Sequence, residues 1–329
     1  MPSRSNPPVL AANAAAPIHQ TMATPHQTPD RILAVGEVLF DHFPGGKRLG
    51  GAPCNFAVHA RGLGMDAQLL TRVGDDDHGN CIQAKLVAFG FHPRLLQVDP
   101  HTPTGAVHVS FSDSGDPAYA IRPAAWDHIG LDPALTTWLK DFSPQMLYFG
   151  SLVQRTPTGA GLIEELATHF NRTSTFLCDL NLRRGNVVRD RVIRCLELCH
   201  ILKLNREELD YLCRTLDLSG TPRECMERIS SRFTISLVAL TRGKSGSILF
   251  SESGFTESAG TIVSDPVNTV GAGDAFCAAL AQGALHNENP EQMLERAGRL
   301  AAAVCRLPGA VPENSDFYRK FISKSSAKE

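Results

Sequence analysis

Six runs of apolar residues recur along the chain, each bounded by turn-forming residues. They are too continuously apolar for a sheet with one solvent-facing side, so we expect a sheet covered on both faces. Segments with helical spacing lie between them, which predicts an α/β fold with a mostly parallel sheet and right-handed crossovers. The expected strands cover residues 31–40, 67–73, 145–152, 175–182, 200–205 and 235–243. The expected helices cover residues 55–63, 78–89, 158–170, 187–199, 206–216, 223–232, 273–285 and 290–305.

Two stretches interrupt this rhythm. They are residues 42–50 and residues 104–124, and the second alternates apolar and polar side chains, as a hairpin with one exposed face does. We therefore expect them to form a small β lid over a cleft. No internal repeat interrupts the domain.

Both ends of the chain differ from its centre. Residues 1–30 contain six prolines, many alanines and Arg4 as the one strong base, so we expect a disordered tail. Two alternatives are a secretory signal, whose apolar stretch would be short and weakly hydrophobic, and a translation start at Met22. Residues 321–329 are expected to form a second tail. No run of 18 apolar residues occurs, which argues against a transmembrane helix.

Composition narrows the class of function. The 329 residues are 43% hydrophobic and 20% charged, with a net charge of -2, which suits a compact enzyme and argues against nucleic acid or a membrane surface as partner. Small-molecule partners are expected, and a homodimer is compatible with the sequence. The nine cysteines form no CxxC pair, and Cys195, Cys199 and His200, expected on one helix, lack a second ligand pair for zinc. We therefore expect buried free thiols and a cytoplasmic location.

The segment NTVGAGDAFC, residues 268–277, points to phosphate chemistry. Gly271 and Gly273 let the backbone turn tightly and offer N–H groups to an anion, and the helix expected after them adds positive potential. Ala272 lies between them. Asp274 would repel a phosphate unless it accepts a proton, so we interpret it as a general base for an attacking hydroxyl. The alternative is a carboxylate that only caps a helix.

Two widely separated segments resemble one family. TVGAGDAF is similar to the C-terminal signature of the ribokinase-like, or PfkB-type, carbohydrate kinases, and residues 36–64 and 72–80 resemble the N-terminal sugar-binding block of their fructokinase branch. The resemblance covers residues 31–320. It implies a three-layer α/β/α fold with a mostly parallel central sheet, ATP as co-substrate and Mg²⁺ as cofactor.

The resemblance also implies a sugar site. Asp41 matches an acid that hydrogen-bonds sugar hydroxyls, a task that suits a carboxylate because it accepts several donors. Gly50, Gly51 and Asn55 match the GGxxxN segment that contacts the sugar. The alternatives are a solvated turn acid for Asp41 and an ordinary hairpin turn for the glycines.

On the nucleotide side, Asn205 and Glu208 match an NxxE element associated with Mg²⁺ and phosphate through water. A helix cap completed by Glu208 is the alternative, and the two roles are compatible. Thr241, Gly243 and Gly246 match a TxGxxG turn beside the triphosphate, although this pattern also fits a plain hairpin.

The segment CDLNLR resembles a stretch near the phosphates. It contains Asp179, Asn181 and Arg183, and Arg183 is the stronger phosphate candidate because a guanidinium binds phosphate oxygens bidentately.

One position departs from the family pattern. The residue six before the expected base is usually an Asp that helps hold a monovalent cation, and here it is Asn268. Backbone carbonyls near Gly309 would close that site. An amide oxygen can still coordinate K⁺, but the site lacks one negative charge, so K⁺ dependence is in doubt.

Taken together, these features predict an ATP-dependent sugar kinase, with D-fructose to fructose 6-phosphate as the leading reaction. A 2-keto-3-deoxygluconate kinase is the first alternative, because Arg122 could meet a substrate carboxylate, whereas Asp41 favours a neutral polyol. Other sugar or nucleoside kinases and a catalytically silent sugar or nucleotide sensor remain open. A dinucleotide-binding oxidoreductase is excluded because no GxGxxG opens the first β–α–β unit.

Overall fold

The main sheet has nine strands in a computed structural model that describes residues 30–43, 46–111, 117–183 and 185–322. Neighbouring strands are parallel except for the antiparallel pairs β11–β12 and β12–β13 at one edge. Both tails expected from the sequence lie almost entirely outside the described residues. In sheet order, the strands are β13 (Gly254–Ser258), β12 (Ser247–Ser251), β11 (Leu237–Thr241), β10 (Ile201–Asn205), β9 (Thr175–Asp179), β8 (Met146–Gly150), β1 (Arg31–Val35), β4 (Asp66–Gly74) and β5 (Leu96–Asp99).

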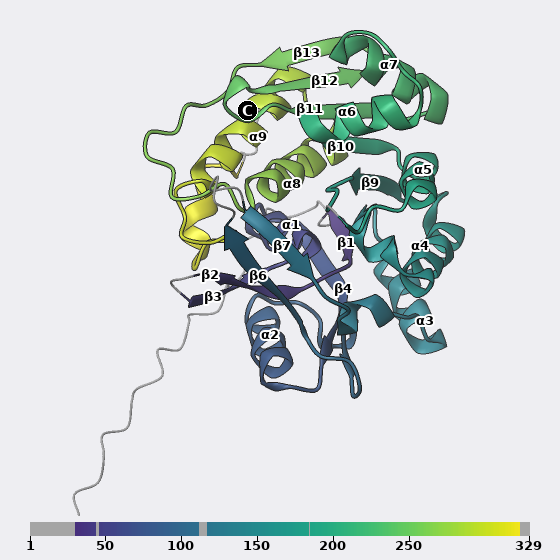
Figure 1. Cartoon of the computed structure of the whole chain (residues 1–329), viewed down its shortest axis with the longest axis vertical. Coiled ribbons are helices and arrows are strands. Elements are labelled where there is room, and N and C mark those ends of the chain that lie inside the picture. Colours follow the sequence, from purple (N-terminus) through teal and green to yellow (C-terminus); the bar gives the residue numbers. More distant parts are fainter. Residues whose placement is uncertain (1–29, 44–45, 112–116, 184, 323–329) are drawn as a thin grey trace, which may run out of the picture.

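Helices cover both faces of this sheet, which confirms the predicted three-layer α/β/α fold (Figure 1). One face carries α1 (Ala52–Gly62), α2 (Asp77–Ala88), α8 (Ala272–Leu285) and α9 (Pro290–Val304). The other carries α3 (Pro133–Phe142), α4 (Pro157–Phe170), α5 (Arg189–Leu198), α6 (Arg206–Thr215) and α7 (Pro222–Phe233). Short 3₁₀ turns are η1 (Pro93–Leu95), η2 (Ala125–His128), η3 (Leu152–Arg155), η4 (Gly243–Ser245) and η5 (Ser315–Tyr318).

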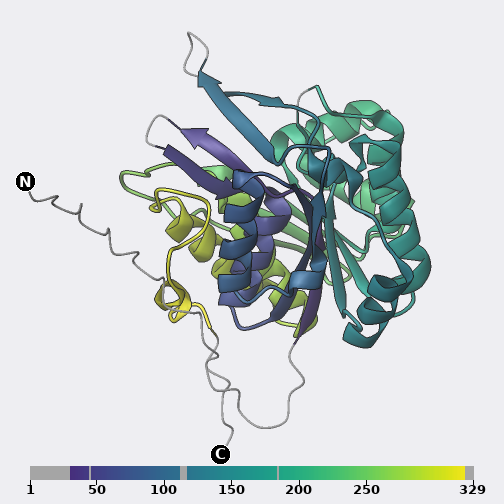
Figure 2. The same cartoon turned by 90° about the horizontal axis from the view of Figure 1, so that it is seen from below.

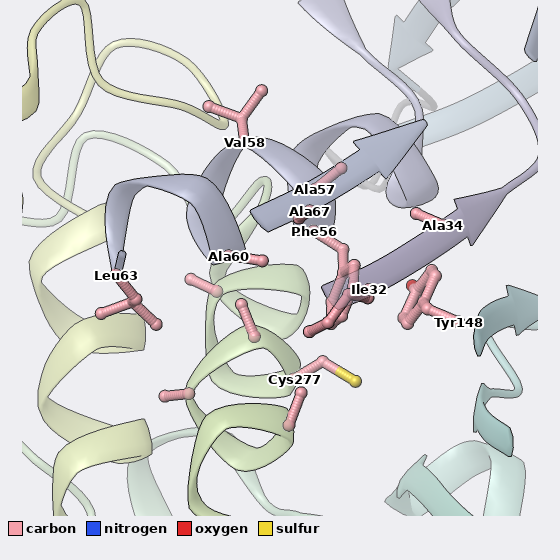
Figure 3. Packing of buried hydrophobic residues seen from close by; sticks show 14 of the residues in the cluster. Ile32, Ala34, Phe56, Ala57, Val58, Ala60, Leu63, Ala67, Tyr148 and Cys277 are labelled. Atoms are coloured by element: carbon pink, nitrogen blue, oxygen red, sulfur yellow. The ribbon is translucent and has the colours of Figure 1, made fainter. Parts of the chain in front are cut away.

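Strand side chains alternate between the two layers, as buried parallel strands require. In β8, Tyr148 packs with α1 and α8, whereas its neighbours Leu147 and Phe149 pack with the opposite helices. Figure 3 shows the first layer, where Phe56 of α1 and Tyr148 stack with ring centroids 3.9 Å apart, near Cys277 of α8. This packing fixes α1 and α8 next to each other over the middle of the sheet.

A second, small sheet stands out from this body (Figure 2). It has the order β3 (Gly46–Gly50), β2 (Leu39–Phe43), β6 (Gly105–Phe111) and β7 (Pro117–Ile121). Its strands confirm the predicted strands within residues 42–50 and 104–124, although β2 already begins at Leu39. The turn between β6 and β7 lies outside the described residues.

Arg155 joins the end of the small sheet to the body. Its guanidinium donates to both oxygens of Asp127, at 2.8 and 2.7 Å, and to the Arg122 carbonyl, at 2.7 Å, directly after β7. A further N–H reaches Oδ1 of Asn186 at 3.0 Å. The guanidinium also lies 4.1 Å from the ring centroid of Trp126. Because Arg155 and Asp127 are buried, this pair anchors the root of the small sheet.

Several sequence expectations were wrong in detail. Residues 31–40 do not form one strand: the chain breaks after β1 and enters the small sheet as β2. The break occurs at Gly36, whose φ of 142° strongly favours glycine. The helix α3 and the edge hairpin β12–β13 were not predicted. Helix α5 ends at Leu198, so Cys199 and His200 do not share a helix with Cys195.

All nine cysteines are free thiols. Within the described residues, no helix is long and apolar enough to span a membrane.

Replacing Gly36 with alanine should destabilise the protein. A Cβ there would lie 2.7 Å from Cγ of Pro53, in addition to the backbone strain. We expect the free energy of unfolding in urea to fall by at least about 2 kcal/mol. Gly64→Ala is the control, because Gly64 has a φ of 95° but open space around its Cβ position. It should cost about 1 kcal/mol. Equal losses would show that Pro53 does not restrict this turn.

Candidate functional site

The predicted site residues gather at the carboxyl ends of the parallel strands. Asp179 ends β9, Asn205 ends β10 and Thr241 ends β11. Glu37, which the sequence analysis did not single out, follows β1. Ligands of open α/β sheets bind at this edge, because the loops and helix N-termini there face a common space. The start of α8 meets this edge, since the Cβ position of Gly273 lies 3.1 Å from Nζ of Lys203 on β10.

The glycine turn before α8 has the features of an anion-binding helix start. Gly271 is the N-cap residue, with a φ of 79°, and its Cβ position lies 2.6 Å from atoms of Ala310. Glycine is therefore required twice, by the backbone angle and by the close approach of Ala310. No described side chain caps this helix. The first-turn N–H groups of Gly273 and Asp274 can therefore bind an anion, aided by the helix dipole.

Asp274 lies in the first turn of α8 and is 8% exposed. Its Oδ2 accepts a 2.8 Å hydrogen bond from Nδ2 of Asn55. The pKa of Asp274 is raised to about 6: burial and the charge of Asp179 raise it, whereas the Asn55 hydrogen bond and the charges of Lys203 and Arg183 lower it. The carboxylate is thus ionised at neutral pH and basic enough to take a proton.

Asn55 has a second polar side-chain atom, Oδ1, beside the amide nitrogen that bonds Asp274. Its side chain is buried, and Oδ1 has no hydrogen-bond partner among the described residues. A buried acceptor without a partner is costly, so a ligand hydroxyl is the natural donor for it.

Asp41 and the glycine pair shape the neighbouring wall. A Cβ at Gly50 would collide with the carboxylate of Asp41, so these two residues pack directly together. A Cβ at Gly51 would collide with the backbone carbonyl of Glu37. The side chain of Glu37 accepts a hydrogen bond at Oε1 from the Ala52 N–H, at 3.1 Å. Burial raises the pKa of Asp41 to about 6 and that of Glu37 to about 7.

Arg183 is the cation that acts on all three of these acids. Its charge lowers the pKa of Glu37, Asp41 and Asp274. The preceding turn contains Asn181 with a φ of 44°, a conformation that asparagine tolerates better than most residues. Arg122, by contrast, is exposed and follows β7, where the structure shows its carbonyl bonded to Arg155.

A buried ion pair, Lys203 with Asp179, lies next to the start of α8. Nζ of Lys203 lies 3.0 and 3.1 Å from the two oxygens of Asp179, its neighbour in register on β9. Burial alone would lower the pKa of Lys203, but the charges of Asp179 and Glu208 outweigh burial and raise it. Sequence analysis did not single out Lys203. Its signal is a lysine inside the otherwise apolar run HILKLN, which demands a buried partner.

Glu208 and Asn205 form the capping box that was the alternative to a metal-linked role. Oδ1 of Asn205 accepts from the Glu208 N–H at 2.9 Å, and Oε2 of Glu208 accepts from the Asn205 N–H at 2.8 Å. Oε1 of Glu208 accepts from the N–H of Leu182 at 3.0 Å. Each carboxylate oxygen therefore keeps one free lone pair, which is compatible with a role through water but not with a dedicated metal cage.

The TxGxxG residues form the turn between β11 and β12. Thr241 donates from Oγ1 to the Leu204 carbonyl at 3.1 Å. Gly243 and Gly246 both have positive φ, of 56° and 84°. A Cβ at Gly246 would collide with the Ser258 carbonyl, whereas Gly243 faces open space. Gly243 is thus the one of the two that leaves room for a ligand.

Asn268 is bonded on both sides of its amide. Its Oδ1 accepts from the Val270 N–H at 2.9 Å, so its Nδ2 donates to the Leu307 carbonyl, also at 2.9 Å. Gly309 lies two residues further, and its Cβ position is 3.0 Å from Cδ of Arg48 in β3. The side-chain amide of Asn268 therefore already donates to the Leu307 carbonyl, which belongs to the segment expected to close a cation site.

Comparisons with known proteins agree with this geometry. Residues 25–316 match the pfkB family carbohydrate kinases. A fructokinase from Klebsiella pneumoniae is 30% identical over 292 residues, which cover 83% of this chain and 90% of the relative. A Vibrio cholerae fructokinase variant, solved with fructose, ADP and potassium, has a TM-score of 0.72 at 20% identity and covers 89% of this chain and 98% of that one.

An Escherichia coli protein assigned as ribokinase II, solved with ATP and Mg²⁺, has a TM-score of 0.76 at 20% identity. Its match covers 89% of this chain and 99% of that one. These structures share the fold, and the family match spans most of the sequence. The chain therefore belongs to the pfkB family of carbohydrate kinases.

Proposed function

We propose that this kinase transfers the γ-phosphate of ATP to a primary hydroxyl of a neutral monosaccharide, with D-fructose as the leading substrate. The observation that carries the proposal is the buried Asp274 carboxylate at the uncapped, glycine-rich start of α8. A base and an anion site thus lie within one turn of helix.

The chemistry follows from this arrangement. Asp274 accepts the hydroxyl proton while the sugar oxygen bonds to the γ-phosphorus and the bond to the departing ADP oxygen breaks. The N–H groups of Gly273 and Asp274 and the charge of Arg183 stabilise the transferring phosphoryl oxygens. Mg²⁺, bound mainly by the nucleotide with Glu208 acting through water, would neutralise charge on the phosphate oxygens.

The balance of charge favours a neutral acceptor. Glu37, Asp41 and Asp274 are three acids whose pKa values the charge of Arg183 lowers. A substrate carboxylate would add a further negative charge, whereas sugar hydroxyls would donate to Asp41 and to the unpartnered Oδ1 of Asn55. The Klebsiella pneumoniae relative is also a fructokinase.

The nine free thiols support a cytoplasmic location.

A panel of acceptors tests the substrate. ADP release from purified protein should be fastest with D-fructose among hexoses, pentoses, nucleosides and 2-keto-3-deoxygluconate. Asp274→Asn keeps the size of the side chain but cannot accept the proton, so kcat should fall at least ~10²-fold. Binding of ATP should change little. Preference for the keto-deoxy acid would overturn the neutral-sugar assignment, and wild-type turnover in Asp274→Asn would overturn the base.

The pH dependence identifies the base. Because Asp274 must be ionised to accept a proton, kcat/KM should fall as the pH drops through about 6, the pKa of its carboxyl. Asn55→Leu removes the hydrogen bond that lowers this pKa, so the acidic limb should move up by about one pH unit. Profiles of kcat/KM from about pH 5 to pH 8 measure this.

Asp41→Asn is the control for that profile, since Asp41 also has a pKa of about 6. The acidic limb should persist in Asp41→Asn. Its loss there, or an unmoved limb in Asn55→Leu, would assign the ionisation to a group other than Asp274.

We further infer that K⁺ activates this enzyme weakly. The Asn268 amide donates to the Leu307 carbonyl, and it provides no negative charge for a cation. The donor set therefore does not fit a strong K⁺ site, although the Vibrio cholerae structure holds potassium.

Asn268→Asp should create a dependence on K⁺. A carboxylate cannot donate to the Leu307 carbonyl, so activity should fall in K⁺-free buffer. The added charge attracts a cation at 4 Å by about 4 kcal/mol before desolvation is subtracted. KCl should therefore restore activity in the variant at a concentration at least about tenfold lower than the concentration that activates the wild type. KCl titrations against choline chloride at constant ionic strength measure this. Strong K⁺ activation of the wild type, unchanged in the variant, would contradict the inference.

A further inference from the structure

The segment behind the anion site is held by a buried histidine that the proposed chemistry does not use. His59 lies on α1, one turn after Asn55, and its side chain is fully buried. Its Nε2 lies 2.9 Å from the Ala310 carbonyl oxygen, and its Nδ1 lies 2.8 Å from the hydroxyl of Tyr318 in η5. His59 is 251 residues away in sequence from Ala310 and 259 from Tyr318.

The chemistry of the partners fixes the state of the ring. A carbonyl oxygen can only accept, so Nε2 must carry the proton and donate it to Ala310. Nδ1 is then unprotonated and accepts from the Tyr318 hydroxyl. Burial lowers the pKa of His59 to about 4, which agrees with a neutral ring at physiological pH. In this pair of hydrogen bonds, Tyr318 therefore donates to His59, and His59 donates to Ala310.

Ala310 is in contact with the catalytic turn. The Cβ position of Gly271 lies 2.6 Å from Cα, Cβ and the carbonyl oxygen of Ala310. Any shift of Ala310 toward α8 would push Gly271. The N–H groups of Gly273 and Asp274, which form the proposed anion site, follow Gly271 directly in the chain and would move with it. The carbonyl that His59 holds is thus part of the wall against which this turn is packed.

The same wall is fixed on its other side. The Leu307 carbonyl accepts from Asn268, and the Cys305 carbonyl accepts from the Val267 N–H at 2.9 Å. Residues 305–310 are therefore held between helix α1 and the segment that precedes Gly271. On the α1 side, His59 is the side chain that makes this link.

We infer that His59, oriented by Tyr318, is a positioning residue that holds the Ala310 carbonyl against Gly271 and so sets the geometry of the anion site. This role rests on the proposed phosphoryl transfer. Helix α1 then positions both halves of the chemistry, the base through Asn55 and the anion-binding turn through His59. Misplacement of reacting groups by about 1 Å can cost ~10²-fold in rate, so a small movement of this wall has a measurable effect.

Three variants test the link. His59→Leu removes the donor, His59→Gln restores an N–H that can reach the Ala310 carbonyl, and Tyr318→Phe removes the hydroxyl but keeps the ring over Gly62. Val58→Ala is the matched control, because Val58 is a buried neighbour on α1 without a polar side-chain group. Steady-state kinetics and hydrogen exchange of the amides in residues 268–275 and 305–311 are measured for each variant.

We expect His59→Leu to lower kcat at least about tenfold, with KM for the sugar within about threefold of the wild type. Exchange should accelerate in both segments. His59→Gln should recover most of kcat, and Tyr318→Phe should lie between it and His59→Leu. Val58→Ala should lower Tm while leaving kcat and the exchange of both segments near those of the wild type.

Other results would overturn the role. An unchanged kcat in folded His59→Leu, or the same loss of kcat in Val58→Ala, would reduce His59 to a packing residue. If His59→Leu does not fold, Tyr318→Phe carries the test, and wild-type exchange and kcat in that variant would overturn the orienting role of Tyr318. If the wild type phosphorylates no sugar, the proposed function fails by itself, whereas exchange with and without a non-hydrolysable ATP analogue still tests the His59 link.

Discussion

The hydrogen bond from Asn55 to Asp274 joins the two halves of the site. Its partners are 219 residues apart in sequence, and it forms because α1 and α8 pack side by side on the same face of the sheet. The packing of Phe56 on Tyr148 fixes α1 there. The residues at the end of β1 and in the small sheet are therefore brought to the glycine turn of α8.

Buried charge is the second constraint, because every ion near the site has to be offset. Lys203 is paired with both oxygens of Asp179, so that pair adds little net charge. Arg183 is then left to offset Glu37, Asp41 and Asp274. Burial is the largest cause of the raised pKa values of these three acids, and the charge of Arg183 lowers each of them. In the proposed reaction, the raised pKa makes Asp274 a better base near neutral pH.

Patterns within short segments predicted much of this arrangement. The apolar runs predicted the parallel strands of the main sheet except β5, and NTVGAGDAFC predicted the start of α8 to within one residue. The capping box of Asn205 and Glu208 was also readable as a local motif. Helix α3 was missed although it carries ordinary local signals, with Asp132 as N-cap residue and Pro133 in its first turn.

Contacts between distant segments could not be predicted in the same way. Gly36 breaks the run of residues 31–40 because Pro53 packs against it, and that contact exists only in the folded chain. Lys203 finds Asp179 through the register of β9 and β10, which the sequence of either strand does not state. The links of His59 to Ala310 and Tyr318 depend on how the C-terminal segment packs against α1.

The anion site as we propose it draws its positive potential from few sources. The carbonyls of Leu307 and Ala310 are held by neutral N–H donors, so their wall is fixed without the full charge that a bound cation would add. Neutral donors contribute only dipoles, and the paired Lys203 contributes little at a distance. In this proposal the helix start and Arg183, whose charge acts on all three acids, attract the phosphates. A site built this way gains a wall whose geometry does not depend on the ionic conditions, and it depends correspondingly more on Arg183.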